Sequence, residues 1–70
     1  MNVQQFIADE LGLPISEVKP DSSIRLLITD SLEMVYLMQE LECKYGVVIP
    51  SEQIGRFLTV GDIISFLEPN

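Results

Sequence analysis

The sequence predicts an all-α fold: a small four-helix bundle, with three main helices, one short helix and a long first loop. Apolar residues recur at spacings of three and four in three separate segments, which is the period of an amphipathic helix. The short β-branched run at residues 47–49 ends at Pro50 and has no second run with which to pair, so we predict a buried loop there. A chain of 70 residues is the size of one small domain, which we place at residues 1–70.

The first helix is predicted over Val3–Leu11. Asn2 precedes it as an N-cap, and Gln5 stands three residues later, where a capping box would place a side chain that reaches back. Gly12 follows as the residue that ends the helix in a left-handed conformation. The apolar face of this helix consists of Val3, Phe6, Ile7 and Leu11.

Residues 13–29 form a connection that is long for so small a domain and that contains Pro14 and Pro20. We predict a loop packed across the helices, with a short turn at residues 16–19. Its apolar side chains need burial, and we expect it of Ile15, Val18, Ile24, Leu26, Leu27 and Ile28.

The second main helix is predicted over Ser31–Tyr45. Asp30 is its N-cap, Glu33 completes a box-like pattern three residues later, and Gly46 ends the helix. Residues at helical spacing define a stripe that faces the core: Met34, Leu37, Met38, Leu41 and Tyr45.

Two further helices follow. A short one begins with Ser51 as its N-cap and stops near Gly55. The last helix has Thr59 as its cap and Asp62 at the third position, and Pro69 terminates it. Its apolar face consists of Val60, Ile63, Ile64 and Leu67.

The composition excludes several classes of function. Eleven acidic residues against four basic ones give a net charge of −7, which repels nucleic acid and attracts basic protein surfaces. The chain has no histidine, so a Ser-His-Asp triad is impossible, and Cys43 as the single cysteine excludes the usual zinc sites. We therefore expect that the protein is not an enzyme and binds no metal. We expect Cys43 to be a small, semi-buried residue.

Location and assembly follow from the same residues. No apolar run approaches the roughly 20 residues that cross a membrane, and the N-terminal residues lack the basic and apolar regions of a signal peptide. One cysteine, which cannot form an internal disulfide, suits a reducing compartment. We expect a cytoplasmic, monomeric protein that does not insert into membranes.

Ser31 is the candidate site. By local chemistry alone, an ordinary surface serine at a helix start is the favoured interpretation. Because Asp30 already caps the helix, however, the Ser31 hydroxyl is free to face solvent. A phosphate ester on it would lie at a helix N-terminus, where free N–H groups favour an anion, although Asp30 and Glu33 would partly oppose that charge.

The segment Asp30-Ser31-Leu32 resembles the signature of acyl carrier proteins, in which the serine bears a 4′-phosphopantetheine arm. The resemblance covers essentially the whole chain and implies that Ser31 is the attachment site. Its other segments are Leu11-Gly12, Glu17-Val18, Val35-Tyr36-Leu37, Leu41-Glu42, Tyr45-Gly46, Ile49-Pro50-Ser51-Glu52 and Thr59-Val60-Gly61-Asp62.

The resemblance implies a carrier that holds acyl intermediates as thioesters on an arm derived from coenzyme A, for fatty acid, polyketide or specialised lipid synthesis. The implied partners are a phosphopantetheinyl transferase, and acyl- or aminoacyl-activating ligases, acyltransferases or synthases with basic docking surfaces. The expected partner-facing residues are Asp30, Leu32, Glu33, Val35, Tyr36 and Gln39. The expected acyl-pocket residues, for which plain core packing is the favoured alternative, are Met34, Met38 and Ile54.

One stretch departs from the family pattern. Fatty-acid carriers usually show Asp-Leu-Gly-x-Asp-Ser-Leu, whereas this chain has Leu26-Leu27-Ile28-Thr29-Asp30-Ser31-Leu32, without the glycine and with a loop that is one residue shorter. The shorter spacing is similar to that of aminoacyl and D-alanyl carriers or of specialised stand-alone carriers. An aminoacyl carrier therefore stays open, as does an unmodified helical adaptor.

Overall fold

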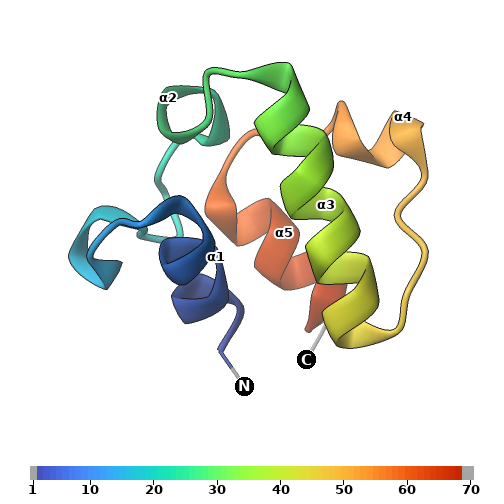
Figure 1. Cartoon of the computed structure of the whole chain (residues 1–70), viewed down its shortest axis with the longest axis horizontal. Coiled ribbons are helices and arrows are strands. Elements are labelled where there is room, and N and C mark those ends of the chain that lie inside the picture. The colour runs from blue at the N-terminus through green and yellow to red at the C-terminus, as the bar shows by residue number, and fades with distance from the viewer. Residues whose placement is uncertain (1, 69–70) are drawn as a thin grey trace.

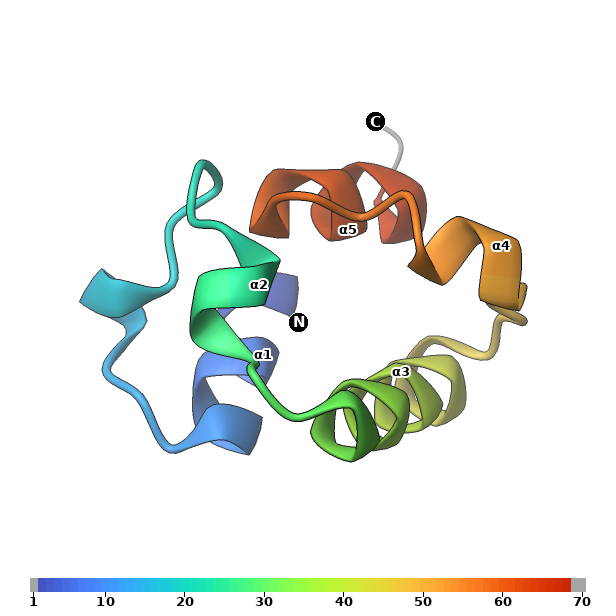
Figure 2. The ribbon, with the colours of Figure 1, turned by 90° about the horizontal axis from the view of Figure 1, so that it is seen from above.

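The structure, a computed structural model, describes residues 2–68 as an array of helices (Figure 1). Helices α1 and α3 lie side by side, and α5 lies across from both of them, as Figure 2 shows. The short α4 lies on the opposite side of α3 from α2 in both views. In chain order the elements are α1 (Val3–Leu11), a 3₁₀ helix η1 (Ile15–Glu17), α2 (Ile24–Leu27), α3 (Ser31–Tyr45), α4 (Ser51–Ile54) and α5 (Val60–Leu67). The all-α prediction is confirmed.

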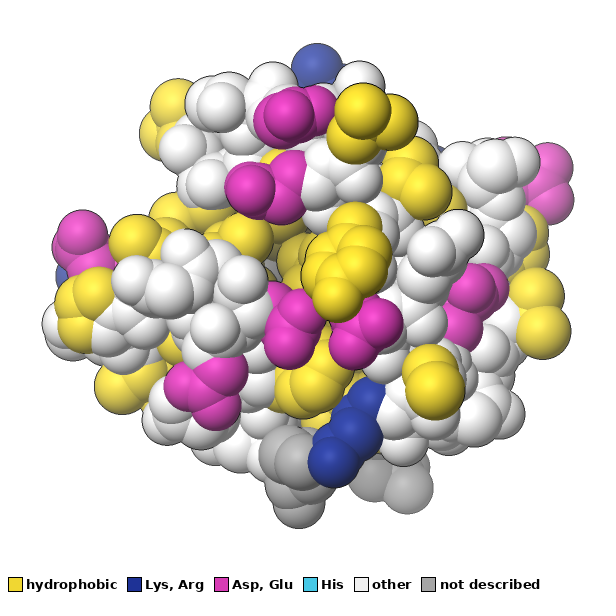
Figure 3. Space-filling view, in the orientation of Figure 1, with side chains coloured by type: hydrophobic (Ala, Val, Ile, Leu, Met, Phe, Trp, Pro, Cys, Tyr) yellow, Lys and Arg dark blue, Asp and Glu magenta, His cyan; other side chains and the backbone are white. Residues whose placement is uncertain are grey.

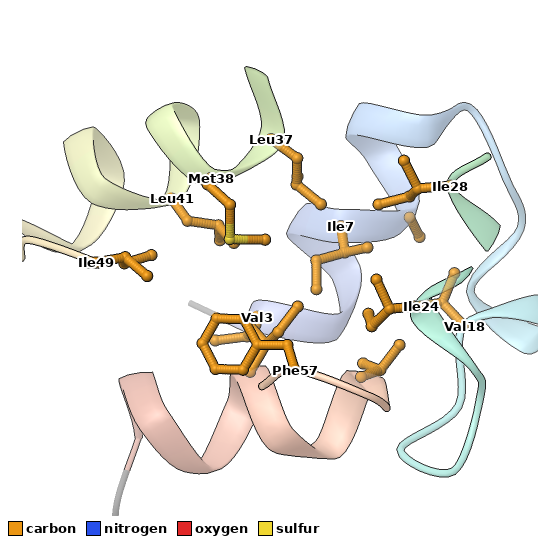
Figure 4. Packing of buried hydrophobic residues seen from close by; sticks show 13 residues of the cluster. Val3, Ile7, Val18, Ile24, Ile28, Leu37, Met38, Leu41, Ile49 and Phe57 are labelled. Atoms are coloured by element: carbon orange, nitrogen blue, oxygen red, sulfur yellow. The ribbon is translucent and has the colours of Figure 1, made fainter. Parts of the chain in front are cut away.

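A single core holds these helices together (Figure 4). Val3 and Ile7 from α1 face Leu37 and Met38 from α3, and Phe57 closes the core from the segment before α5. The Phe57 ring also meets the ring of Phe66 edge to face, with centroids 5.7 Å apart. The buried set is Val3, Ile7, Ala8, Val18, Ile24, Ile28, Leu37, Met38, Leu41, Ile49, Phe57, Val60 and Ile63.

The start of α1 follows the prediction in part. The Asn2 side chain caps it by accepting hydrogen bonds from the backbone N–H groups of Gln4 and Gln5, at 2.8 and 3.3 Å. The predicted capping box is wrong, because the Gln5 amide does not reach back; it donates to Asp9 Oδ1 one turn further on. In a capping box the Gln5 side-chain oxygen would accept from the Asn2 backbone N–H, whereas here the Gln5 NH₂ group donates to a carboxylate at i+4, a charge-assisted bond.

The glycines that end α1 and α3 are confirmed. Gly12 has φ 69° and Gly46 has φ 65°, the left-handed conformation that only glycine adopts without strain. The predicted terminator of α5, Pro69, lies outside the described residues.

The long connection contains more structure than we predicted. The turn appears as η1, and residues 24–27 form the short helix α2, which the prediction treated as loop. Four residues are too few for helical periodicity to appear in the sequence. None of the residues of η1 is buried, and α2 buries one side only, so Ile15 is exposed and Leu26 is 82% exposed, contrary to prediction, while Leu27 is half-buried. Burial is confirmed for Val18, Ile24 and Ile28.

Three backbone hydrogen bonds fasten this connection to the segment before α5. They join residues 20–24 to residues 58–61 around a bridge between Ser23 and Thr59. The fastening sets α2 beside the start of α5, although the two are far apart in sequence. The bonds are donated by Ile24 to Leu58 (3.0 Å), by Val60 to Ser22 (3.0 Å) and by Gly61 to Pro20 (2.7 Å).

The segment around α4 also differs from prediction. Only Ile49 of the run at residues 47–49 is buried, and Val48 is 81% exposed, so the loop is not buried throughout. Two N–H groups hold it to Glu42: that of Val47 donates to the Glu42 carbonyl at 3.2 Å, and that of Ile49 donates to Glu42 Oε2 at 2.6 Å. Helix α4 begins at Ser51 with Pro50 before it, one residue from the predicted cap. Cys43 is exposed rather than semi-buried, because it lies on the outer side of α3.

Candidate functional site at the start of helix α3

The first turn of α3 is capped by one side chain. Asp30 has an extended backbone, and its Oδ1 accepts a hydrogen bond from the Leu32 N–H at 2.9 Å. The first helical bond runs from the Met34 N–H to the Asp30 carbonyl, at 3.1 Å. The predicted cap is confirmed. The predicted box-like role of Glu33 is wrong, because among residues 2–68 its carboxylate accepts no hydrogen bond from the Asp30 backbone.

Ser31 therefore stands at the first helical position with no structural task. Its side chain is exposed, and none of the side-chain hydrogen bonds among residues 2–68 involves its hydroxyl. The prediction of a hydroxyl that faces solvent is confirmed. Such a group can react without first breaking an internal bond.

A pocket of about 400 Å³ opens beside Ser31. Two of the expected acyl-pocket residues, Met34 and Ile54, line it, whereas Met38 is only 2% exposed and belongs to the core. The walls come from α2, the residues that join it to α3, the first turns of α3, the end of α4 and the segment after α4. They are Arg25, Ile28, Thr29, Asp30, Ser31, Met34, Val35, Ile54, Gly55 and Phe57.

The sequence did not indicate several of these lining residues. Arg25, Ile28 and Phe57 reach the pocket only because residues 20–24 are fastened to residues 58–61, which brings α2 and the segment before α5 to the start of α3. No local pattern encodes that approach.

The outer side of α3 is exposed along its first two turns. Leu32 is 77% and Tyr36 is 58% exposed, with Val35 between them in sequence and also exposed. Figure 3 shows acidic side chains beside hydrophobic ones on this side of the molecule. All six residues that we expected to face partners lie at the surface: Asp30, Leu32, Glu33, Val35, Tyr36 and Gln39.

Known proteins that are similar to this chain include acyl carrier proteins. The family profile described as "Phosphopantetheine attachment site" matches residues 2–67. The chain belongs to the acyl carrier protein family. An acyl carrier protein of Helicobacter pylori (strain G27) is 37% identical over 70 residues, covering 99% of this chain and 90% of that protein. One of Exiguobacterium sibiricum is 39% identical over 69 residues, covering 97% and 87%.

Membership in this family makes the protein a phosphopantetheine-bearing acyl carrier that works with synthase and transferase enzymes, and not a catalyst. The residues at the start of α3 fit the arm. An exposed hydroxyl can form the ester, and the neighbouring pocket has a largely apolar wall that could receive the arm or its cargo.

No helix within residues 2–68 is both long and apolar enough to cross a membrane. No group of three or more His, Cys, Asp or Glu side chains in that range is arranged to hold a metal ion.

Proposed function

We propose that Ser31 is the residue that bears the 4′-phosphopantetheine arm, and that the protein presents acyl thioesters on this arm to biosynthetic enzymes. One observation carries the proposal: Asp30 supplies the cap of α3, so the Ser31 hydroxyl is exposed and unbonded at the mouth of the 400 Å³ pocket. An ordinary capping serine would have its hydroxyl engaged with a backbone N–H.

Attachment needs a phosphopantetheinyl transferase and coenzyme A. The Ser31 Oγ forms an ester bond to the phosphorus next to pantetheine, the pyrophosphate bond of coenzyme A breaks, and adenosine 3′,5′-bisphosphate leaves. The hydroxyl proton passes to a base of the transferase or to water. The N-terminus of the 15-residue α3 favours the phosphodiester that results.

The arm supplies a terminal thiol that holds the acyl group as a thioester. Tethering raises the effective concentration of that group at each enzyme that binds the carrier. Met34 and Ile54 line the pocket that could shelter an acyl chain, since methionine adapts to variable shapes. Met38 would contact such a chain only if the core opened.

The exposed side of α3 is the proposed docking surface. Leu32, Val35 and Tyr36 form its apolar centre, Asp30 and Glu33 supply negative charge beside the arm, and Gln39 extends it one turn on. Partners with basic surfaces are the transferase, activating ligases, acyltransferases and synthases. The net charge of −7 would steer them to the carrier, and salt would slow that encounter.

Loading tests the attachment site. Co-expression with a broad-specificity transferase should raise the intact mass by one arm, and Ser31→Ala should abolish the increase. Ser51→Ala is the matched control, because Ser51 is likewise exposed at the first position of a helix. No mass increase with any transferase, or an increase that persists in Ser31→Ala, would overturn the proposal.

Transferase kinetics test the docking surface. Tyr36→Ala should lower kcat/KM through a higher KM, by roughly the tenfold that about 1.4 kcal/mol of lost contact gives. Val48→Ala is the control, since Val48 is also a large exposed hydrophobic residue but lies beyond the other end of α3. Equal losses in the two variants would argue against a docking surface on α3.

Cargo is tested by competition. The relatives are named acyl carrier proteins, which favours an acyl cargo over an aminoacyl one. Loading by an aminoacyl- or D-alanyl-activating ligase, and not by acyl-loading enzymes, would reverse that choice. An unmodified adaptor predicts instead a native protein without the arm and partner binding that survives Ser31→Ala. Cytoplasmic location and a monomeric state stay predictions.

A further inference from the structure

The pocket beside Ser31 contains one basic residue. The chain has only four, and of these Arg25 alone lines the pocket; the others are Lys19, Lys44 and Arg56. None of the side-chain hydrogen bonds among residues 2–68 involves the Arg25 guanidinium. Its five donors are thus available to a ligand in the pocket.

The backbone of Arg25 is held firmly although its side chain is exposed. Ile24 before it is fully buried, and the Ile24 N–H donates to the Leu58 carbonyl at 3.0 Å. Ile28 after it is buried as well, and its N–H closes α2 by donating to the Ile24 carbonyl at 2.8 Å. The buried, hydrogen-bonded residues Ile24 and Ile28 therefore fix the backbone position from which the Arg25 side chain reaches the pocket.

The other charged residue that lines the pocket is negative. Asp30 is the carboxylate among the lining residues, and Glu33 stands exposed on the same turn as Ser31. A phosphodiester on Ser31 would add a negative charge to a chain that already carries −7. A guanidinium near it offsets that repulsion and matches phosphate oxygens with two parallel N–H donors.

We propose that Arg25 is a positioning residue for the arm: its guanidinium pairs with the phosphodiester on Ser31 and holds the arm along the pocket. This inference rests on the proposed attachment at Ser31. If the pair forms, the arm exchanges between a position against the pocket and a position free in solvent. The strength of the Arg25–phosphodiester ion pair then sets the populations of the two positions.

The ³¹P resonance of the loaded protein tests the pair directly. The loaded carrier should have a free thiol and no cargo, and be measured near neutral pH or below, so that the phosphodiester is the anion of the arm. The same protein unfolded in urea supplies the reference shift. We expect the folded protein to differ from that reference, and Arg25→Gln to remove more than half of the difference.

Two controls define the result. Arg25→Lys should keep part of the shift difference, because an ammonium supplies the charge without the planar pair of donors. Lys44→Gln should leave it unchanged, since Lys44 is exposed in the last turn of α3 and does not line the pocket. An Arg25→Gln resonance equal to that of the unsubstituted protein would overturn the proposal.

A salt titration of the unsubstituted carrier needs no variant. Raising the ionic strength to about 1 M shortens the screening length to about 3 Å and should move the resonance towards the unfolded reference. A resonance that ignores salt would count against the ion pair. Failure of the attachment itself is distinguishable, because the protein would then gain no mass and show no phosphorus signal.

Discussion

The starts of α3 and α5 share a sequence pattern but differ in how their polar groups are paired. Each has a capping residue followed three positions later by an acid, Asp30 with Glu33 and Thr59 with Asp62. At α5 the capping box closes: Thr59 Oγ1 accepts from the Asp62 N–H at 3.3 Å, and Asp62 Oδ2 accepts from the Thr59 N–H at 3.0 Å. At α3 only the Asp30 bond to the Leu32 N–H forms.

Burial follows the same division. The first residue of α5, Val60, is fully buried and tied to the Ser22 carbonyl, whereas Ser31 and Leu32 at the start of α3 are exposed. The start of α5 is thus buried and hydrogen-bonded to another segment, whereas the side chains at the start of α3 are exposed to solvent. The comparison teaches that the same sequence pattern leaves a hydroxyl and an acid unpaired at the start of α3 but pairs its polar groups internally at the start of α5.

The largest expected effect separates the two starts by function. Ser31→Ala should abolish arm attachment while changing the free energy of unfolding by no more than about 0.5 kcal/mol, because its hydroxyl supports nothing. Thr59→Ala should load normally and lose about 1 kcal/mol, the usual cost of a lost cap. Intact mass and urea unfolding measure both. A Ser31→Ala protein less stable than Thr59→Ala would contradict the division.

The next effect concerns the fastening that supports α5. A Cβ on Gly61 would lie 2.9 Å from the Pro20 carbonyl oxygen, which is backbone and cannot swing away. Gly61→Ala should therefore cost about 1–3 kcal/mol as the bond between the two segments is pushed apart. Thermal or urea unfolding measures the loss.

Gly55→Ala is the control for that prediction. The nearest atom to a Cβ at Gly55 is 3.7 Å away, an ordinary contact, and its φ of −66° suits any residue. Its stability should change little or rise by up to about 1 kcal/mol, since alanine restricts the unfolded chain. Equal losses at the two glycines would show that the close approach to Pro20 does not matter.

The smallest effect is a pH dependence at the α5 start. Hydrogen bonds from the Leu58 and Thr59 backbones lower the pKa of Asp62 below its ordinary 3.8. The folded protein thus binds fewer protons than the unfolded chain, so this contribution is complete above pH 3.8 and is lost as the pH falls through the lowered pKa. Urea midpoints across this range should fall less steeply for Asp62→Asn. An unchanged slope would count against the box as its source.

Local patterns predicted the main helices well. The bounds of α1 and α3 match the expected ones, and their glycine ends are confirmed at Gly12 and Gly46. Caps and periodic apolar stripes lie within a few residues of each other, so they can be read without knowing the fold. Burial inside the connections was harder to predict, as Leu26 and Val48 show, because a loop residue points inward or outward according to distant neighbours.

The sequence by itself determined where the main helices run, that the chain is an acidic helical carrier and that Ser31 stands free at the start of α3. Only the tertiary structure decided what surrounds that serine. The fastening of residues 20–24 to residues 58–61 brings Arg25 and Phe57 to Met34 and so makes the pocket. Helix signals are encoded within one or two turns, whereas a pocket built from three segments depends on long-range contacts, which no local spacing records.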